Sequence, residues 1–221
     1  IVVVQEPDSN SAVARLEAGD LDMYADDIAG EAAIQAINSD NLQTRTQYGL
    51  FDELQFNIGT CQDETLLNPF TDAKIREAMN YAIDREGIIH HILRGEGTPA
   101  KGPIPTSMPG YGERVWGFTY DPEKARSLLA EAGYPGGKNL PEITLQLNSA
   151  GRLNELLAEV IQQQLEAVGF KIRLKVVEWS QHLDTVERGD VGFFRLGWNA
   201  DYVDPENFLA LFDSRNFSPA G

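Results

Sequence analysis

The chain has 221 residues, 42% of them hydrophobic and 24% charged, a composition that can bury the core of one large domain or two small ones. Acidic residues outnumber basic residues by 34 to 18, and the formal net charge of -16 would repel a nucleic-acid backbone or an anionic membrane surface. We therefore expect no nucleic acid among its partners.

Cysteine and histidine are too few and too far apart to predict a disulfide or a metal site. Cys61 is single, and His90, His91 and His182 show no H-x-x-x-H or C-x-x-C spacing. We predict no metal and no cofactor, and we expect the histidines to be solvated. The longest apolar runs, such as Ile1 to Val4, are far shorter than the roughly 20 residues of a membrane-spanning helix. Because the chain begins without a methionine or a leader, we interpret it as a fragment.

The first 60 residues predict a small unit of alternating strands and helices. The expected elements are a strand at Val2–Val4, a helix around Val13 and Leu16 that ends at Gly19, a strand at Leu21–Tyr24, a helix at Glu31–Asn38 and a strand at Leu50–Ile58. The periodicity is lost after Gly59, which predicts a boundary between substructures near residue 60.

Helix signals are strong in the next part of the chain. Asp72 to Ile83 is a predicted amphipathic helix, and Asp84 is placed to cap the helix that follows. Asp121-Pro122 combines an N-cap residue with proline at the first helical position. Between them, Gly95–Phe118 carries six glycines and four prolines, which predicts an extended surface loop.

From Ile143 onward, strands and helices alternate regularly. Strands are predicted at Ile143–Leu147, Ile172–Val176 and Val191–Leu196, with helices at Leu153–Val168 and around Leu183 and Val186. Strands joined by crossover helices lie parallel, so we predict an α/β fold with a mostly parallel sheet flanked by helices. The last strand is apolar throughout, which predicts a central position with both faces buried.

Polar and aromatic residues follow two of these strands directly. Ligands of open α/β sheets bind beyond the carboxyl ends of the strands, so a site is expected there. Two tryptophans would wall it, Asp201 would receive a cationic group, and Arg195 would receive a carboxylate. The predicted ligand-binding residues are Trp179, Arg195, Trp198, Asn199, Asp201 and Tyr202.

Each of the main site candidates also has a purely structural interpretation. Trp198 could fill space in the core, and Trp179 could simply cover the sheet. Asp201 could be a turn residue or, with Asp204-Pro205, lead into a helix cap. Arg195 could pair with one of the many surface acids.

An enzyme is poorly supported by the sequence. There is no G-x-S-x-G motif, and Ser39-Asp40-Asn41 lacks the S-x-x-K and K-T-G motifs that accompany this triplet in β-lactamases. Asp201 and Asp204 have no evident histidine, lysine or metal partner for acid–base work. We predict a binding protein without catalysis.

Five stretches, taken in order, resemble one known family. Asn68–Ile89, NPFTDAKIREAMNYAIDREGII, is similar to the "F-x-D-x-x-V-R-x-A-x-x-x-A-I-D-R" segment of extracytoplasmic solute-binding proteins of the oligopeptide/dipeptide ABC-importer type. The other similar stretches are Gly95–Pro105, Tyr120–Tyr134, Glu178-Trp179 and Gly197–Leu209 (GWNADYVDPENFL); ARLEAGDLDM near the front also resembles the family's "L-x-x-G-E-x-D" unit.

The resemblance implies a type II periplasmic-binding-protein fold, in which two lobes close over a ligand. Residues 1–59 would be the C-terminal part of lobe one ending in a hinge strand, and residues 60–221 most of lobe two, truncated before the return hinge. Such a protein is expected to be a periplasmic or extracytoplasmic monomer, and lipid anchoring through a missing N-terminus is left open. It captures di- or oligopeptides and delivers them to the membrane permease of an ABC importer.

The resemblance also assigns roles to individual residues. It places the ligand's α-amino group on Asp201, a pocket wall on Trp198, the peptide carboxylate on Arg195 and a side-chain pocket on Trp179. Oligopeptide binders have a second arginine nine residues before the first, where this chain has Val186, so the preferred peptide length does not carry over. Other members of the family bind sugars or nickel complexes, and a ligand-sensing domain of a regulator is a further alternative.

Overall fold

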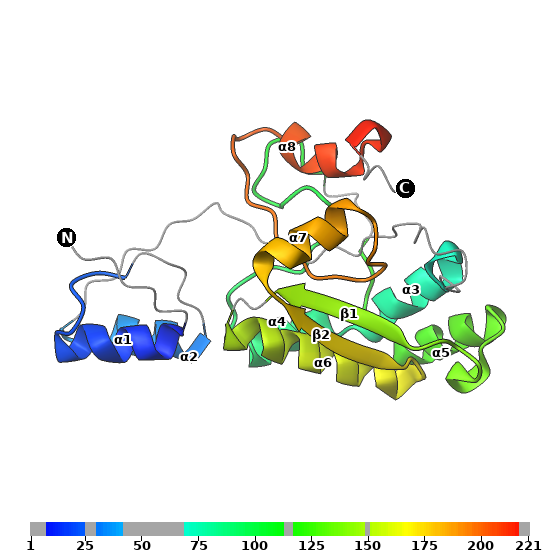
Figure 1. Cartoon of the computed structure of the whole chain (residues 1–221), viewed down its shortest axis with the longest axis horizontal. Coiled ribbons are helices and arrows are strands. Elements are labelled where there is room, and N and C mark those ends of the chain that lie inside the picture. Colours follow the sequence, from blue (N-terminus) through cyan, green and yellow to red (C-terminus); the bar gives the residue numbers. More distant parts are fainter. Residues whose placement is uncertain (1–7, 25–29, 42–68, 113–116, 149–150, 217–221) are drawn as a thin grey trace.

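The computed structural model describes residues 8–24, 30–41, 69–112, 117–148 and 151–216 (Figure 1). Its main elements in chain order are α1 (Ser9–Ala18), α2 (Gly30–Asn38), α3 (Ala73–Ala82), α4 (Arg85–His91), α5 (Pro122–Glu131), β1 (Ile143–Asn148), α6 (Arg152–Val168), β2 (Ile172–Val177), α7 (Trp179–Glu187) and α8 (Glu206–Leu209). Single turns of 3-10 helix lie at η1 (Pro69–Thr71), η2 (Pro135–Gly137), η3 (Ala210–Phe212) and η4 (Ser214–Asn216).

The sheet is parallel, as the alternation of strands and helices predicts. β1 and β2 pair in register from Ile143 opposite Ile172 to Asn148 opposite Val177. On the other side of β1, Phe194 forms a parallel bridge with Gln146. The order β2, β1 and then the Phe194 segment makes β1 the middle strand of the described sheet.

The predicted third strand, Val191–Leu196, is shorter and less central than expected. Only the bridge at Phe194 forms, and in the part of the chain that the structure describes this segment pairs on one side alone. Gly192 lies inside the segment and Gly197 follows it, and glycine gives a strand no side chain to pack. The prediction of a central strand is therefore corrected, although Phe193 and Phe194 are buried as expected.

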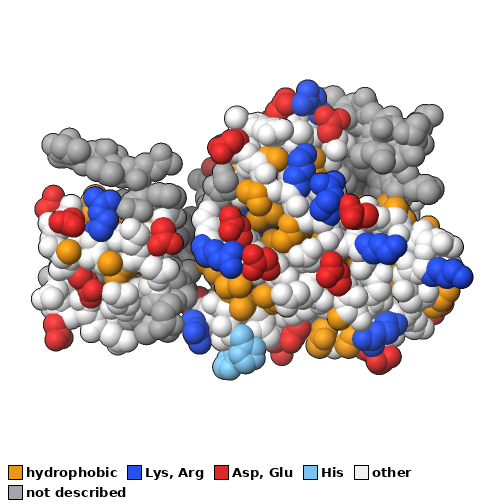
Figure 2. Space-filling model, turned by 60° about the horizontal axis from the view of Figure 1, so that its bottom comes forward, with side chains coloured by type: hydrophobic (Ala, Val, Ile, Leu, Met, Phe, Trp, Pro, Cys, Tyr) orange, Lys and Arg blue, Asp and Glu red, His pale blue; other side chains and the backbone are white. Residues whose placement is uncertain are grey.

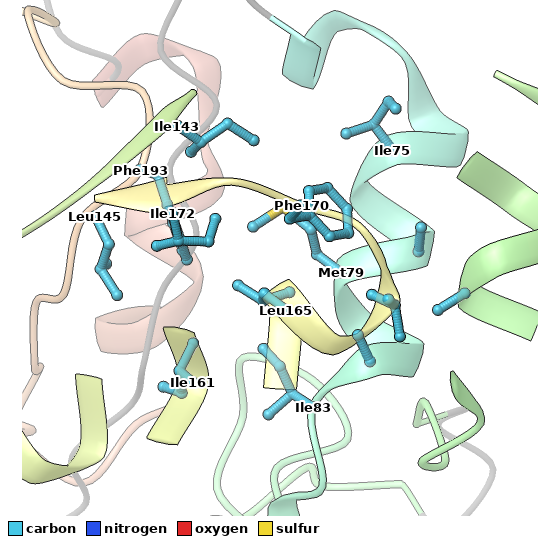
Figure 3. Packing of buried hydrophobic residues seen from close by; sticks show 14 of the residues in the cluster. Ile75, Met79, Ile83, Ile143, Leu145, Ile161, Leu165, Phe170, Ile172 and Phe193 are labelled. Carbon is cyan, nitrogen blue, oxygen red and sulfur yellow. The ribbon is translucent and has the colours of Figure 1, made fainter. Parts of the chain in front are cut away.

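Helices cover both faces of the strand pair. α6 packs on one face, with α3 and α5 beside it, and α7 lies across the other (Figure 1). The main core forms on the α6 face, where Leu145 and Ile172 of the strands meet Leu165 of α6 and Met79 of α3 (Figure 3). Periodic apolar residues of this kind define the buried side of an amphipathic helix, so the sequence pattern and the core agree.

The predicted helix caps are confirmed. The side chain of Asp84 accepts a hydrogen bond from the backbone N–H of Gly87 (2.9 Å), and Asp121 accepts one from Lys124 (2.9 Å). Asp72 accepts from the N–H of Lys74 (2.8 Å), so the helix predicted to begin at Asp72 starts one residue later. Each cap satisfies a backbone donor that the helix itself leaves unpaired.

One backbone contact permits only glycine. η2 lies against the end of α6, and a Cβ atom built on Gly137 would stand 1.7 Å from the carbonyl oxygen of Gly169. Both residues also have positive φ, 75° and 116°. Through this contact, the segment before β1 packs closely against the turn between α6 and β2.

The front of the chain forms a small separate cluster. α1 and α2 pack through Val13, Ala32 and Ala36, and Gly19 ends α1 with φ of 78°, as predicted. The prediction of a strand at Leu21–Tyr24 is wrong. The N–H of Leu21 donates to the carbonyl of Arg15 in the last turn of α1 (3.3 Å), and Met23 is 77% exposed.

Other predictions for this region lie outside the described residues. They are the strands at Val2–Val4 and Leu50–Ile58 and the boundary near residue 60. No helix among the described residues is both long enough and apolar enough to cross a membrane.

The excess of acidic residues does not form one continuous acidic patch on the face shown in Figure 2. Acidic and basic side chains alternate there, with apolar patches between them (Figure 2). Several opposite charges are paired, including Arg152 with Glu159 (3.0 Å) and Arg173 with Glu142 (2.9 Å). Exposed pairs of this kind contribute at most about 1 kcal/mol each, so they shape the surface more than they stabilise the fold.

Candidate ligand site

The carboxyl ends of the parallel segments define one edge of the sheet. β1 ends there at Asn148 and β2 at Val177, and the chain leaves the Phe194 bridge towards the same edge. α7 starts immediately after β2, and the loop 197–205 runs from the bridge segment to α8. The six predicted site residues therefore lie at this edge or on the loop that leaves it.

Trp179 presents a half-exposed aromatic ring at this edge. It is the first residue of α7, its side chain is 50% exposed, and its ring stacks on His182 with centroids 6.0 Å apart and an interplanar angle of 25°. His182 itself is fully buried, so the prediction that it is solvated is wrong. His90 and His91 are exposed, in agreement with that prediction.

The backbone of Arg195 is fixed from two sides. Its N–H donates to the Gln146 carbonyl of β1 (2.9 Å), and its carbonyl accepts from Nε2 of His182 (2.9 Å). Arg195 and Trp179 are thus brought together through one histidine. The Arg195 side chain is partly buried.

Trp198 is anchored to α8. Its Nε1–H donates to Oδ1 of the buried Asn207 (2.8 Å), which ties the start of the loop 197–205 to the helix at its end. Trp198 remains partly exposed, so it does not simply fill space in the core. A buried indole normally finds such a polar partner, and here the partner fixes its orientation.

Asp201 is exposed on the loop between these anchors. Within the described chain its carboxylate makes no hydrogen bond and no ion pair, and Asn199 and Tyr202 beside it are also exposed. The cap at the start of α8 comes from Asp204, whose Oδ1 accepts from the N–H of Glu206 (2.8 Å). The geometry therefore gives the capping role to Asp204 and leaves Asp201 without a structural task.

The long loop predicted at Gly95–Phe118 borders this segment. Its described residues contain no helix or strand, and one of them, Met108, is buried. Gly110 has φ of 88°, and a Cβ atom there would lie 3.3 Å from Cγ of Pro205. The loop thus supports the end of the segment that carries Asp201, next to α8 (Figure 1).

A buried polar network lies beneath the site, and the sequence interpretation missed it. Nε2 of Gln146 donates to Oγ1 of Thr185 (2.9 Å) and lies 3.2 Å from Nδ1 of His182. Burial lowers the pKa of His182 below its ordinary value, and the hydrogen bond to the Arg195 carbonyl only partly opposes this shift. Burial therefore favours the neutral form of His182.

Helical spacing could have identified this network. His182 stands three residues after Trp179 and three before Thr185, so all three share one side of α7. Gln146 is a polar residue at the centre of an otherwise apolar strand, which is a signal of a buried hydrogen-bonding role. The anchor Asn207 carries no comparable signal.

Metal-binding groups do not gather at this edge. Across the described ranges, no three or more histidine, cysteine, aspartate or glutamate side chains are placed to hold an ion. What the edge offers is aromatic surface, the exposed carboxylates of Glu178, Asp201 and Asp204, and an arginine whose backbone is held in place, which is chemistry suited to a small-molecule binding site.

Fold and site together define a class of protein. The parallel sheet with helices on both faces has the type II periplasmic-binding-protein architecture of similar solved structures. Residues 1–219 match the family model described as bacterial extracellular solute-binding proteins, family 5 Middle, and the chain belongs to this family. The resemblance found in the sequence is thereby confirmed.

Two curated relatives and one solved structure illustrate the similarity. Heme-binding protein A of Haemophilus influenzae is 31% identical over 218 residues, covering 98% of this chain and 39% of the relative. The dipeptide-binding protein of Escherichia coli is 34% identical over 166 residues, covering 75% of this chain and 31% of the relative. The structure of the periplasmic binding protein DppA from Helicobacter pylori, in complex with the peptide STSA, aligns with a TM-score of 0.71 at 25% identity over 93% of this chain and 38% of its own.

The chain spans less than half the length of these relatives. Their names also differ in ligand, since one is a heme binder and two are peptide binders. The comparisons therefore show the family, that of bacterial extracellular solute-binding proteins, and do not show one common solute.

Proposed function

We propose that this protein is the solute-binding component of an ABC importer, which captures di- or oligopeptides between two lobes and delivers them to the membrane permease. The observation that carries the proposal is the exposed carboxylate of Asp201, which has no partner among the residues that the structure describes and lies on a loop fixed at both ends. A free α-amino group is the natural partner for such a carboxylate. Trp198 and Trp179 would bury peptide side chains, and Arg195 would receive the carboxylate end.

The proposal also assigns the chain to two lobes. Residues 1–59 would complete lobe one and end in a hinge strand, and residues 60–221 would form most of lobe two. Closure of the lobes would remove water from the Asp201 site, which strengthens an ion pair only if its hydrogen bonds are kept. The protein would act as a periplasmic or extracytoplasmic monomer.

A non-peptide solute is the second candidate. The heme binder of Haemophilus influenzae matches almost the whole chain, and exposed aromatic rings such as Trp179 suit any flat ligand. The two candidates differ in what they require from Asp201, because a ligand without an amino group gains nothing from that carboxylate.

Native mass spectrometry of the complete gene product, purified without denaturation, tests the proposal first. We expect co-purified masses that fragment as short peptides, and calorimetry with a panel of di-, tri- and tetrapeptides should then show binding. A co-purified porphyrin or sugar, together with no heat from any peptide, would overturn the peptide assignment and favour the second candidate.

A further inference from the structure

His182 connects three elements at the edge of the sheet without touching solvent. It belongs to α7, its Nδ1 faces Gln146 in the middle of β1 (3.2 Å), and its Nε2 meets the carbonyl of Arg195 (2.9 Å). The rings of Phe194 and His182 pack edge to face, with their centroids 6.1 Å apart and an interplanar angle of 77°. The remaining face of His182 supports the half-exposed ring of Trp179.

These contacts specify one chemical form of the imidazole. A backbone carbonyl can only accept a hydrogen bond, so Nε2 must carry the proton that bonds to Arg195. Nδ1 is then the unprotonated nitrogen of a neutral ring, and it accepts from the Nε2–H of Gln146. The amide group of Gln146 is held in turn by Thr185, so the arrangement is fixed at both ends.

We propose that neutral His182 is a positioning residue, which holds Trp179 and the segment Arg195–Trp198 as one rigid wall of the ligand site. This inference rests on the proposed function, because it assumes that the wall contacts a captured solute. His182 itself is too deeply buried to reach a ligand. Its effect on affinity would come from pre-organisation, since a wall that is already ordered loses less entropy when the solute binds.

Two amide substitutions separate this role from simple core packing. The amide nitrogen of glutamine can occupy the position of Nε2, so His182→Gln keeps a donor for the Arg195 carbonyl. The shorter asparagine places its nitrogen near the position of Nδ1, where it cannot reach that carbonyl. Both are polar, both remain smaller than histidine, and only one preserves the link between α7 and the Arg195 segment.

Affinity is measured by calorimetry on the complete gene product with the tripeptide Ala-Phe-Ala as the probe. We expect His182→Gln to bind within about threefold of the wild type, and His182→Asn to bind about tenfold more weakly, the factor that corresponds to loss of one net hydrogen bond. Equal affinities for all three proteins would overturn the proposal.

A ligand-independent measurement keeps the test decisive if the probe does not bind. Fluorine NMR of protein labelled with 5-fluorotryptophan reports on Trp179, whose signal is assigned by its loss in Trp179→Phe. The signal should stay sharp and unshifted in His182→Gln and should shift or broaden in His182→Asn. If the wild type ignores Ala-Phe-Ala, the proposed peptide function is in doubt and the NMR result alone decides; an unchanged signal in His182→Asn contradicts the positioning role.

Discussion

The two faces of β1 are built on opposite principles. Leu145 and Leu147 point into an apolar core in which side-chain contacts need no particular partner. Gln146 and Asn148, from the alternate positions of the same strand, are buried on the other side. There Gln146 donates to Thr185, and within the described chain each of the two residues retains a side-chain oxygen without a partner. One face stabilises the fold, and the other positions the site.

This difference predicts separate responses to substitution. Changes on the α6 face and at its glycine contact should lower stability and affect binding only through unfolding. Changes to the exposed residues at the start of α7 and on the loop 197–205 should alter binding with little loss of stability. The comparison fails if the two sets of substitutions cannot be distinguished.

The largest expected effect is that of Gly137→Ala. The new methyl group would collide with the Gly169 carbonyl at 1.7 Å, and backbone cannot move aside as a flexible side chain can. We expect a loss of about 3 kcal/mol or more in the free energy of unfolding, measured by urea titration. Gly133→Ala is the matched control, since its φ of 95° is also positive but nothing lies within 4 Å of the new atom. It should lose only about 1 kcal/mol through backbone strain.

A core truncation on the same face comes next. Leu165 of α6 is fully buried, so Leu165→Ala should cost about 2–5 kcal/mol by leaving a cavity. Val203, which is exposed on the loop 197–205, provides the contrast, and Val203→Ala should stay within about 0.5 kcal/mol of the wild type. Similar losses for the two variants, measured by thermal or urea unfolding, would contradict the described core.

Helices and core were predictable from the sequence because they depend on short-range patterns. Caps at Asp84 and Asp121 and the apolar face of α3 follow from spacing alone. The strand at Leu21–Tyr24 failed because alternation in four residues does not guarantee a pairing partner. The third strand was overestimated because an apolar run does not reveal how many neighbours it has.

The site was less predictable because it depends on contacts between distant residues. The sequence located Trp179, Trp198 and Asp201 at one edge of the sheet, and the structure agrees. It gave no hint that Asn207 would orient Trp198, and the polar position of Gln146 in an apolar strand signals burial without naming its partner on α7, 36 residues away. Such pairs are fixed by tertiary packing, and no local pattern encodes them.

A smaller effect is expected from pH on the polar face. Burial lowers the pKa of His182 in the folded protein, while the unfolded chain keeps a value near the ordinary 6.5 or so. The unfolded state then binds more protons as the pH falls through that value, so stability present at neutral pH is lost on acidification. The positive charge of Arg195 also lowers the pKa of His182. Stability should fall more between about pH 7.5 and about pH 5.5 in the wild type than in His182→Gln; identical falls would show that His182 does not titrate in this way.

The smallest effect on stability is expected at the site itself. Asp201 has no partner within the described residues, so Asp201→Asn should change the free energy of unfolding by less than about 0.5 kcal/mol. Asp204→Ala is the comparison, because Oδ1 of Asp204 caps α8 and removal of that acceptor should cost about 1 kcal/mol. A clearly destabilised Asp201→Asn protein would mean that Asp201 has a structural role.

The central claim is that Asp201 receives the amino group of a peptide, and a double-mutant cycle tests it most directly. Calorimetry would compare wild type and Asp201→Asn, each with Ala-Phe-Ala and with its N-acetylated form. We predict that either change alone weakens binding by roughly 10- to 100-fold, and that the second change adds little once the first is made. If both changes leave affinity unaltered, or if their effects simply add, the amino group is not bound by Asp201.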